Sequence, residues 1–282
     1  AYGATRAYTV ETPLIEAPEL ARRIGAARAF VKAESLQRAG SFKIRGALWR
    51  LINLPSEQRA RGVVAYSSGN FAQGLAMAGR LMGGAVTIVM PVDAPALKQA
   101  RTAELGARVV LSDHGSRPRE EAASELARTI SQDEGLALLH PFDDPLIVAG
   151  QAGAGLEAME QLAHVRAAAD VVACCAGGGG LVAGVSLAFH YLSPATRVIA
   201  AEPEGYDSLG ESLRRESRTR VAAGSATVCD ALQATLTGEA PFAAARLAGT
   251  RGVAVGDAAV VAAMRRTFEE LKLVVEPSGA AA

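Results

Sequence analysis

The sequence is poor in lysine, cysteine and histidine, and it carries no excess charge of either sign. Its 29 basic residues balance 29 acidic residues, so the formal net charge at pH 7 is zero. Such a chain offers no electrostatic reason to bind a nucleic acid or an anionic membrane. No apolar run approaches the ~20 residues that a membrane-spanning helix needs. We therefore expect neither a nucleic acid nor a membrane as partner.

The three cysteines and four histidines have spacings that exclude two common kinds of site. Cys174 and Cys175 are adjacent, so they point to opposite faces of a strand, and Cys229 is distant in sequence. They match neither a disulfide framework nor a zinc motif, and we expect buried, reduced thiols in a cytoplasmic protein. Because the histidines show no HExxH-type spacing, a hydrolytic zinc centre is not expected.

The ends of the chain carry little information. The first residues lack the basic-then-apolar layout of a signal peptide. The sequence begins without Met and stops at VVEPSGAAA, so we expect both ends to be trimmed or disordered. The 282 residues suffice for one large or two modest domains.

Short β-branched runs alternate with segments of helical periodicity. The strand-like runs lie at 27–34, 62–68, 85–91, 107–113, 170–176 and 197–203, and the helical segments at 71–83, 95–106, 119–135 and 181–192. Apolar strands that alternate with helices are typical of parallel sheets covered on both faces. Two such clusters, 62–140 and 140–282, flank the stretch HPFDDPLIVAG. We predict an α/β fold of two open parallel-sheet domains, with ligands at the carboxyl ends of the strands in a cleft between them.

Two strand-to-helix turns have the composition of anion sites. Gly177, Gly178, Gly179 and Gly180 separate the strand DVVACCA from the helix LVAGVSLAFHYL. Their N–H groups and the helix N-terminus predict a phosphate cradle, with a plain tight turn as the alternative. The second turn follows the strand GVVAY and consists of Ser67, Ser68, Gly69 and Asn70. It is either a helix N-cap or a second anion site.

Only four of the 29 basic residues are lysines, and one of them has the setting of a nucleophile. Lys32 lies in a strand-like run, and Lys98 and Lys272 lie on helical patterns. Lys43 follows Phe42 directly, at the point where the chain enters a helix. An amine beside apolar Phe42 and cationic Arg45 is disfavoured as an ammonium, which makes a lysine nucleophilic. An ordinary surface lysine is the alternative.

Four motifs in this order carry a resemblance that covers nearly the whole chain. They are SFKIRGA at 41–47, SSGNFAQG at 67–74, CAGGGGLVAG at 175–184 and VVEPSGAA at 274–281, with TPL at 12–14, PFDDP at 141–145 and AEPEG at 201–205 as further matches. The chain resembles the threonine/serine dehydratase and serine racemase family of pyridoxal-phosphate (PLP) enzymes, which have fold type II, the tryptophan synthase β-like fold. The resemblance implies a large PLP-binding domain (1–61 plus 141–282), a small substrate-binding domain (62–140) and the PLP cleft between them.

The resemblance also implies a role for single residues. Lys43 is the lysine that forms the Schiff base with PLP, and Phe42 packs against the ring of the cofactor. Asn70 hydrogen-bonds the ring hydroxyl, and Ser278 faces the pyridine nitrogen. The phosphate is held by Gly177, Gly178, Gly179, Gly180 and the amide of Leu181.

The activity implied is that of an ammonia-lyase (dehydratase) acting on L-threonine, L-serine or a related 3-hydroxy amino acid. The turn of Ser67, Ser68, Gly69 and Asn70 binds the substrate carboxylate, and Lys43 removes the Cα proton. Two alternatives stay open. One is a serine racemase, with Ser68 returning a proton from the opposite face. The other is a dehydratase for a bulkier or acidic substrate such as 3-hydroxyaspartate. A cytoplasmic homodimer in amino-acid metabolism is the family expectation.

Three departures from the family pattern affect these expectations. Phe71, in the substrate-binding set, stands where the family more often has His, and GQAGAGLE at 150–157 lacks the usual Thr. Family members often bind a divalent cation, Mg²⁺ or Ca²⁺, through the Glu of AEP and a later acid. Glu202 and Asp207 are the candidate ligands here, but Ser208 occupies the position where the last acid is expected. Hard cations need several oxygens.

Overall fold

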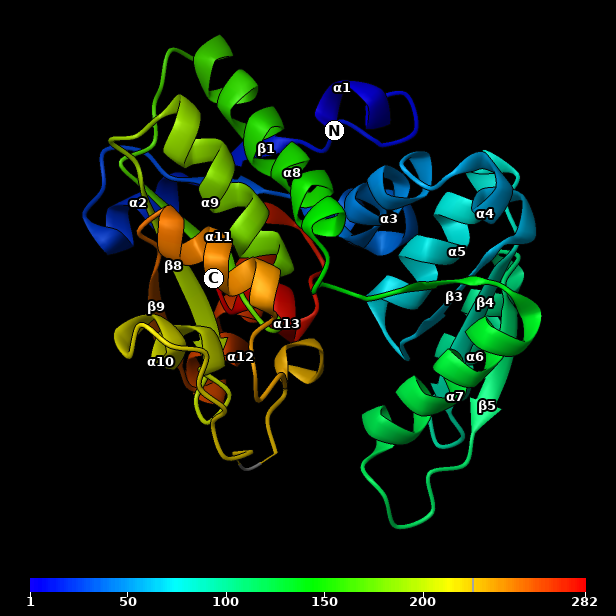
Figure 1. Cartoon of the computed structure of the whole chain (residues 1–282). Coiled ribbons are helices and arrows are strands. Elements are labelled where there is room, and N and C mark those ends of the chain that lie inside the picture. Colours follow the sequence, from blue (N-terminus) through cyan, green and yellow to red (C-terminus); the bar gives the residue numbers. More distant parts are fainter. Residues whose placement is uncertain (225) are drawn as a thin grey trace. The chain divides into compact units, whose positions relative to one another are not determined.

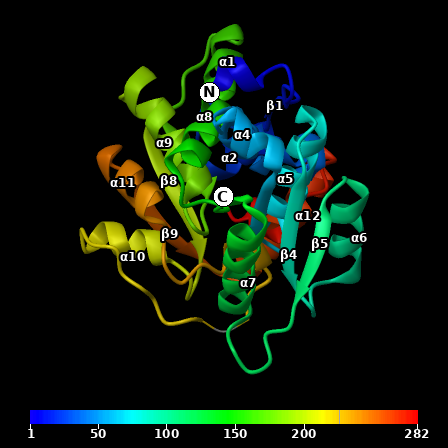
Figure 2. The same ribbon diagram turned by 45° about the vertical axis from the view of Figure 1, so that its right-hand side comes forward.

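The computed structural model describes residues 1–224 and 226–282, which form three separate sheets (Figures 1 and 2). Contacts divide the chain into two compact units. Unit 1 contains Ala1, residues 3–10 and residues 37–150, and unit 2 contains Tyr2, residues 11–36 and residues 151–282. Each unit has its own parallel sheet. In unit 2 the short strands β1 (Leu14–Glu16) and β2 (Phe30–Lys32) add an antiparallel pair.

The sheet of unit 1 has the strand order β5-β4-β3-β6, with all strands parallel. Its strands are β3 (Val63–Tyr66), β4 (Val86–Pro91), β5 (Arg108–Ser112) and β6 (Ala137–Leu139). Val63 and Ala65 join the apolar cluster under α3 and α5, whereas Val64 packs with Ala123 and Ala127 of α7 on the opposite face. This alternation shows a sheet covered on both faces, because successive strand residues point to opposite sides.

The helices of unit 1 are α3 (Lys43–Ile52), α4 (Ser56–Arg61), α5 (Asn70–Met82), α6 (Ala96–Glu104) and α7 (Arg119–Glu134), and α8 (Pro145–His164) begins there. The short helices α1 (Tyr2–Thr5), η1 (Glu34–Leu36) and η2 (Arg38–Gly40) precede α3. Two glycines bring backbones close to α3. A Cβ on Gly74 of α5 would lie 2.9 Å from the amide nitrogen of Ile44, and a Cβ on Gly150 of α8 would lie 2.6 Å from Cα of Gly46.

The sheet of unit 2 has the order β7-β8-β9, also parallel. Its strands are β7 (Val171–Cys175), β8 (Arg197–Pro203) and β9 (Arg251–Val255), and its helices are α2 (Pro18–Ile24), α9 (Gly180–Leu192), α10 (Ser208–Arg214), η3 (Asp230–Leu232), α11 (Glu239–Leu247), α12 (Asp257–Leu271) and α13 (Pro277–Ala280). One apolar cluster joins β7 and β8 to α9 and α11. A second joins Cys175 and Cys229 to Val260 of α12.

The predicted α/β class with parallel sheets is confirmed. Each predicted strand run contains a strand, and each predicted helical segment matches a helix to within a few residues. Lys272 differs from its expected helical pattern, because α12 ends at Leu271. Lys272 caps that helix in the left-handed conformation, with φ of 56°. The three cysteines are free thiols, and Cys174 and Cys229 are buried.

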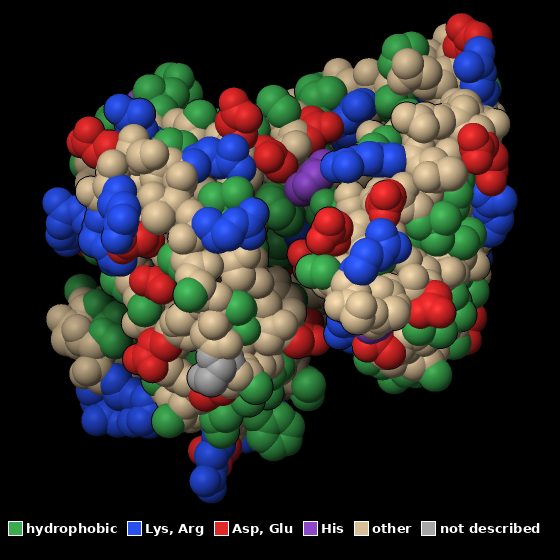
Figure 3. All heavy atoms as spheres, turned by 60° about the horizontal axis from the view of Figure 1, so that its bottom comes forward, with side chains coloured by type: hydrophobic (Ala, Val, Ile, Leu, Met, Phe, Trp, Pro, Cys, Tyr) green, Lys and Arg blue, Asp and Glu red, His purple; other side chains and the backbone are tan. Residues whose placement is uncertain are grey.

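On the face in Figure 3, side chains of both charge signs are interspersed. Among the helices of the described residues, none combines the length and the apolar character that crossing a membrane requires.

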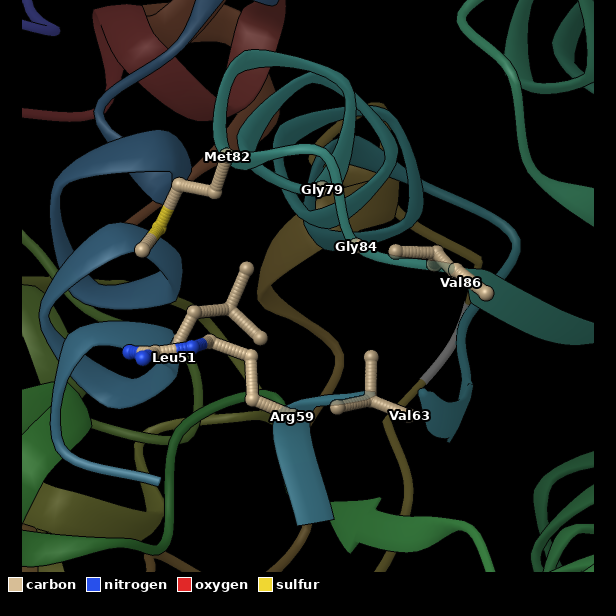
Figure 4. Close-up of a pocket in the computed structure, with 8 residues that line it drawn as sticks. Leu51, Arg59, Val63, Gly79, Met82, Gly84 and Val86 are labelled. Atoms are coloured by element: carbon tan, nitrogen blue, oxygen red, sulfur yellow. The ribbon is translucent and has the colours of Figure 1, made fainter. Parts of the chain in front are cut away.

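A small pocket lies in unit 1 between α3, α5 and the sheet (Figure 4). Val63 and Val86, which line it, are the first residues of β3 and β4. Leu51 and Met82 close it from the helices. Ligands of open α/β sheets bind at the carboxyl ends of the strands. This pocket is at the amino ends, so it is not the candidate site.

Candidate active site

The amine of Lys43 in unit 1 contacts a backbone carbonyl and two aromatic rings. Lys43 is the first residue of α3, and its Nζ donates to the carbonyl oxygen of Pro141 at 3.2 Å. The centroids of the Phe42 and Phe71 rings lie 5.3 and 5.9 Å from Nζ. Phe71 itself is buried in the apolar cluster of unit 1. The amine therefore has apolar neighbours, which suits a lysine that must react as a free base.

The turn between β3 and α5 lies at the carboxyl end of the sheet. The amide of Ser67 donates to the carbonyl of Val89, which continues the pairing of β3 with β4. The Ser67 hydroxyl accepts from the amide of Gly69 at 3.3 Å, and α5 begins at Asn70 without a side-chain cap. Ser68 is half-buried in this turn. A hydroxyl-rich turn at the N-terminus of a 13-residue helix has the features of an anion site.

The glycine turn of unit 2 presents backbone N–H groups at the start of α9. Gly179 has φ of 93° and is the N-cap of this 13-residue helix, again without a side-chain cap. Within the described part of the chain, no acceptor is recorded for the amides of Gly178, Gly179, Gly180 and Leu181. The first N–H groups of a helix lack partners inside the helix, and they carry partial positive charge. The amides of the glycine turn and of Leu181 therefore suit a phosphate group.

Ser278 lies against the same segment of unit 2 as the glycine turn. Its Oγ accepts from the amide of Ala231 at 3.1 Å, and the residue is 2% exposed. A Cβ on Gly177 would lie 3.1 Å from the carbonyl oxygen of Ala231. The structure therefore brings Ser278 and the glycine turn together around Ala231. The bond from Ala231 uses a lone pair of the serine and leaves its own hydrogen available to donate.

Glu202, at the end of β8, is fully buried and paired with backbone. Its Oε1 accepts from the amide of Leu209 and its Oε2 from the amide of Gly210, both at 2.8 Å. Burial raises the pKa of Glu202 to about 7, against the opposing effect of these two hydrogen bonds. Asp207 instead forms an ion pair with Arg214 at 3.4 Å.

Comparison with known proteins decides the family. The family model described as pyridoxal-phosphate dependent enzyme matches residues 6–282. The chain belongs to the family of pyridoxal-phosphate dependent enzymes. It is 40% identical over 251 residues to the L-threonine ammonia-lyase of Thermotoga maritima, covering 89% of this chain and 60% of that protein.

Two further comparisons extend this result. The chain is 36% identical over 271 residues to the L-threo-3-hydroxyaspartate ammonia-lyase of Saccharomyces cerevisiae, covering 96% of this chain and 80% of that protein. The structure of maize serine racemase superposes with a TM-score of 0.90 at 33% identity, covering 98% of this chain and 81% of that one. The predicted resemblance and the fold type II class are confirmed.

The residues present fit the cofactor of this PLP-dependent family. The uncapped amides around Gly179 suit its phosphate, and the free hydrogen of the Ser278 hydroxyl suits an unprotonated ring nitrogen. The turn has no room for a side chain on Gly179, since its Cβ would lie 2.9 Å from Cβ of Pro241. Lys43 supplies an amine. These assignments to PLP remain proposals.

The predicted site residues fall into two sets, each within its own unit. Unit 1 holds Phe42, Lys43 and the turn Ser67–Phe71, and unit 2 holds the glycine turn, Leu181, Ser278, Glu202 and Asp207. Sequence reasoning missed the residues that hold these sets in place. They include His140 and Tyr66 in unit 1 and Ala231 in unit 2. The motif HPFDDP, in which a histidine precedes a proline at the end of a strand, could have pointed to His140.

The expected divalent cation finds a poor donor set in this PLP-dependent enzyme. Both oxygens of Glu202 accept backbone N–H groups, Asp207 pairs with Arg214, and the buried Oγ of Ser208 has no partner. Among the residues described, no three His, Cys, Asp or Glu side chains cluster as ligands. No chemical step is therefore assigned to a cation here.

We expect Mg²⁺, Ca²⁺ and a chelator to leave the melting temperature and turnover of this protein unchanged. Ser208→Asp adds a third carboxylate beside Glu202, which should introduce stabilisation by Ca²⁺, because hard cations are held by several anionic oxygens. Differential scanning fluorimetry with and without each ion measures this. Ser208→Asn, equal in size but uncharged, is the control. A Ca²⁺-dependent rise in the unmodified protein would show that the present donors already bind a cation.

Proposed function

We propose that the chain is an ammonia-lyase that converts L-threonine, L-serine or a related 3-hydroxy amino acid to a 2-oxo acid and ammonia. The observation that carries this proposal is the setting of Lys43, whose amine lies at the start of α3 within 5.9 Å of the centroids of two aromatic rings. Its relatives named as ammonia-lyases support the reaction type. The chain spans 60% of the first of these relatives, so the activity of the whole protein is proposed.

Both sets of residues act on one PLP molecule in this proposal. Lys43 holds it through the amine, Asn70 at the ring hydroxyl and Ser278 at the ring nitrogen. The phosphate is held by the amides of the glycine turn and of Leu181. We propose a large PLP-binding domain (1–61 plus 141–282) and a small substrate-binding domain (62–140). These bounds differ from those of the two compact units, because residues 37–61 and 141–150 belong to unit 1 together with 62–140. When bound, PLP supplies a sink for the electrons of the Cα–H bond.

The residues of the chain perform the remaining steps. The Ser67–Asn70 turn binds the substrate carboxylate, and this fixes the orientation of the Cα–H bond. Lys43 takes the Cα proton as general base. Loss of this proton and of the β-hydroxyl removes one water, and hydrolysis of the enamine that is released consumes one water. The net products are a 2-oxo acid and ammonia.

Ser278 favours elimination over reactions that need a stronger electron sink. A hydroxyl, unlike a carboxylate, does not keep a proton on a pyridine nitrogen. The amide of Ala231 supports this polarity, because it occupies a lone pair of Oγ and leaves the hydroxyl hydrogen to donate. A milder sink would be sufficient for a reaction in which the β-hydroxyl leaves soon after Lys43 takes the Cα proton.

Phe71 supports a neutral β-substituent over an acidic one. Its ring is 2% exposed, belongs to an apolar cluster, and offers neither a charge nor a donor 5.9 Å from the amine of Lys43. An acidic substrate such as 3-hydroxyaspartate, the substrate in the name of the yeast relative, is therefore the second candidate. Serine racemisation, with Ser68 as the proton donor on the opposite face, is the alternative supported by the maize structure.

A screen of 3-hydroxy amino acids for 2-oxo acid release tests the proposal. We expect L-threonine or L-serine to be consumed with the highest kcat/KM, and L-threo-3-hydroxyaspartate with a lower one, because Phe71 provides no partner for a second carboxylate. Chiral chromatography of serine in the same reactions measures racemisation. D-serine formed faster than pyruvate would replace the lyase with the racemase. A homodimer in the cytoplasm is part of the proposal, and light scattering tests the dimer.

A further inference from the structure

The turn that follows β6 is organised by the ring of His140. Its Nδ1 accepts the amide hydrogens of Phe142 at 3.3 Å and Asp143 at 2.8 Å. The next residue, Asp144, accepts from the amide of Leu146 at 2.7 Å at the start of α8. Two backbone amides thus depend on a single ring nitrogen. An acceptor at this position must be unprotonated, so the hydrogen bonds place the ring hydrogen on Nε2.

The carbonyl of this turn contacts the amine of the proposed Schiff-base lysine. Pro141 lies between His140 and the two amides that the ring holds, and its oxygen accepts from Nζ of Lys43 at 3.2 Å. All of these residues belong to unit 1. Proline has no N–H, so Pro141 cannot itself donate to anchor the turn. The ring of His140 therefore anchors the turn through the amides of Phe142 and Asp143, which directly follow the Pro141 carbonyl.

The opposite side of the ring reaches the strand that carries the substrate turn. Nε2 of His140 lies 3.1 Å from the hydroxyl of Tyr66, the last residue of β3, and β3 pairs with β6. The Tyr66 and Phe142 rings both meet the imidazole edge-on, at centroid distances of 5.9 and 4.6 Å. Ser67 follows Tyr66 directly. One imidazole thus links the turn that contains the Pro141 carbonyl to the start of the Ser67–Asn70 turn.

The groups around His140 keep its ring neutral near pH 7. Burial, above all, lowers the pKa of His140 from the ordinary value of 6.5, with Lys43 and Arg128 acting in the same direction and Asp143 and Asp144 against them. Burial also raises the pKa of the Tyr66 phenol, so this neighbour stays protonated. Above pH 6.5 the His140 ring is therefore neutral, and its Nδ1 can accept hydrogen bonds. As the pH falls through the lowered pKa of His140, protonation of the ring removes this acceptor.

We propose that His140 is a positioning residue, whose Nδ1 holds the turn that presents the Pro141 carbonyl to the amine of Lys43. Its importance for turnover rests on the proposed function, whereas its effect on Lys43 does not. If the Nδ1 acceptor is lost, the hydrogen bonds from the amides of Phe142 and Asp143 to the ring are lost as well. The Pro141 carbonyl can then move away from the amine of Lys43. A displacement of about 1 Å at a reacting group costs up to about 100-fold in rate.

Two isosteric variants separate the two ring nitrogens. In His140→Asn the side-chain oxygen takes the place of Nδ1 and can accept the same amides, without titrating. His140→Gln extends to the place of Nε2, which keeps a partner for Tyr66 but removes the acceptor at Nδ1. We expect kcat within about threefold of the unmodified enzyme for His140→Asn and a loss of about 10- to 100-fold for His140→Gln.

The decisive measurement uses the cofactor-free protein and no substrate. Competitive acylation, read by peptide mass spectrometry, gives the reactivity of Lys43 relative to Lys98 at each pH. In the unmodified protein we expect this ratio to change in a step below pH 6.5, as His140 gains a proton. His140→Asn should keep the high-pH ratio throughout, and His140→Gln should show the low-pH ratio throughout.

Other outcomes overturn the inference. Equal ratios in both variants, or the same step retained in His140→Asn, would show that Nδ1 does not control the amine of Lys43. If His140→Gln fails to fold, the presence of the step in the unmodified protein and its absence in His140→Asn still decide. Because no substrate is used, failure of this inference leaves the lyase proposal standing, and failure of the lyase screen leaves the labelling result interpretable.

Discussion

Replacing Lys43 by alanine is expected to reduce 2-oxo acid formation by at least about 10³-fold. The change removes both the amine that holds PLP and the general base, and general base catalysis alone contributes about 10² to 10⁴ in rate. Lys43 is half-buried and its amine lies near the rings of Phe42 and Phe71, and no other lysine of the described chain belongs to unit 1 except Lys98. Steady-state kinetics with the preferred substrate measure the loss.

Two variants control for charge and for general effects of losing a lysine. Lys43→Arg keeps the positive charge, but a guanidinium stays protonated and forms no stable Schiff base. We expect it to be as inactive as Lys43→Ala. Lys98→Ala removes a lysine of α6 in the same unit and should retain full activity. Activity in Lys43→Ala equal to that of Lys98→Ala would contradict the proposed role.

Replacing Gly179 by alanine is expected to weaken PLP binding by at least about tenfold. The residue has φ of 93°, where an L side chain costs about 1–2 kcal/mol, and its Cβ would lie 2.9 Å from Pro241 Cβ and 3.0 Å from Thr237 Oγ1. Relief of these contacts must move the turn whose amides are proposed to hold the phosphate. A shift of 1.4 kcal/mol corresponds to tenfold in affinity. Titration of the cofactor-free variant with PLP, followed by absorbance, measures it.

Gly249→Ala is the matched control for this variant. Gly249 also belongs to unit 2 and has φ of 70°, but a Cβ there would meet no atom within 4 Å. The Gly249→Ala variant should therefore be destabilised only by the unfavourable backbone conformation. We expect a lower melting temperature and an unchanged PLP affinity. Equal PLP affinity in Gly179→Ala and Gly249→Ala would argue against the glycine turn as the phosphate site.

The fold could be predicted from the sequence where local pattern determines structure. The apolar runs of β3, β4 and β7, each followed by a helix, are sufficient to predict parallel sheets. The strands β1, β6 and β9 were not predicted. β1 and β6 have three residues each, and three of the five residues of β9 are exposed, so none of them produces a clear apolar run.

The candidate site could be predicted only as two separate groups of residues. Lys43 and the glycine turn were found because an isolated lysine and a run of four glycines are local signals. The contacts of Lys43 with Pro141 and of Ser278 with Ala231 span 98 and 47 positions, so no local pattern records them. Gly74 and Gly150 escaped notice for the same reason. Their role is to let α5 and α8 approach α3, which is visible only when the helices are packed.

The most direct test of the account is to locate the amine that holds PLP. The protein purified with PLP is reduced with borohydride, digested, and analysed by mass spectrometry for phosphopyridoxyl peptides. The four lysines occupy different peptides and structural settings, which makes the result unambiguous. We expect one modified peptide, which contains Lys43 of the motif SFKIRGA. Modification of Lys32, Lys98 or Lys272 instead, with Lys43 unlabelled, would contradict it.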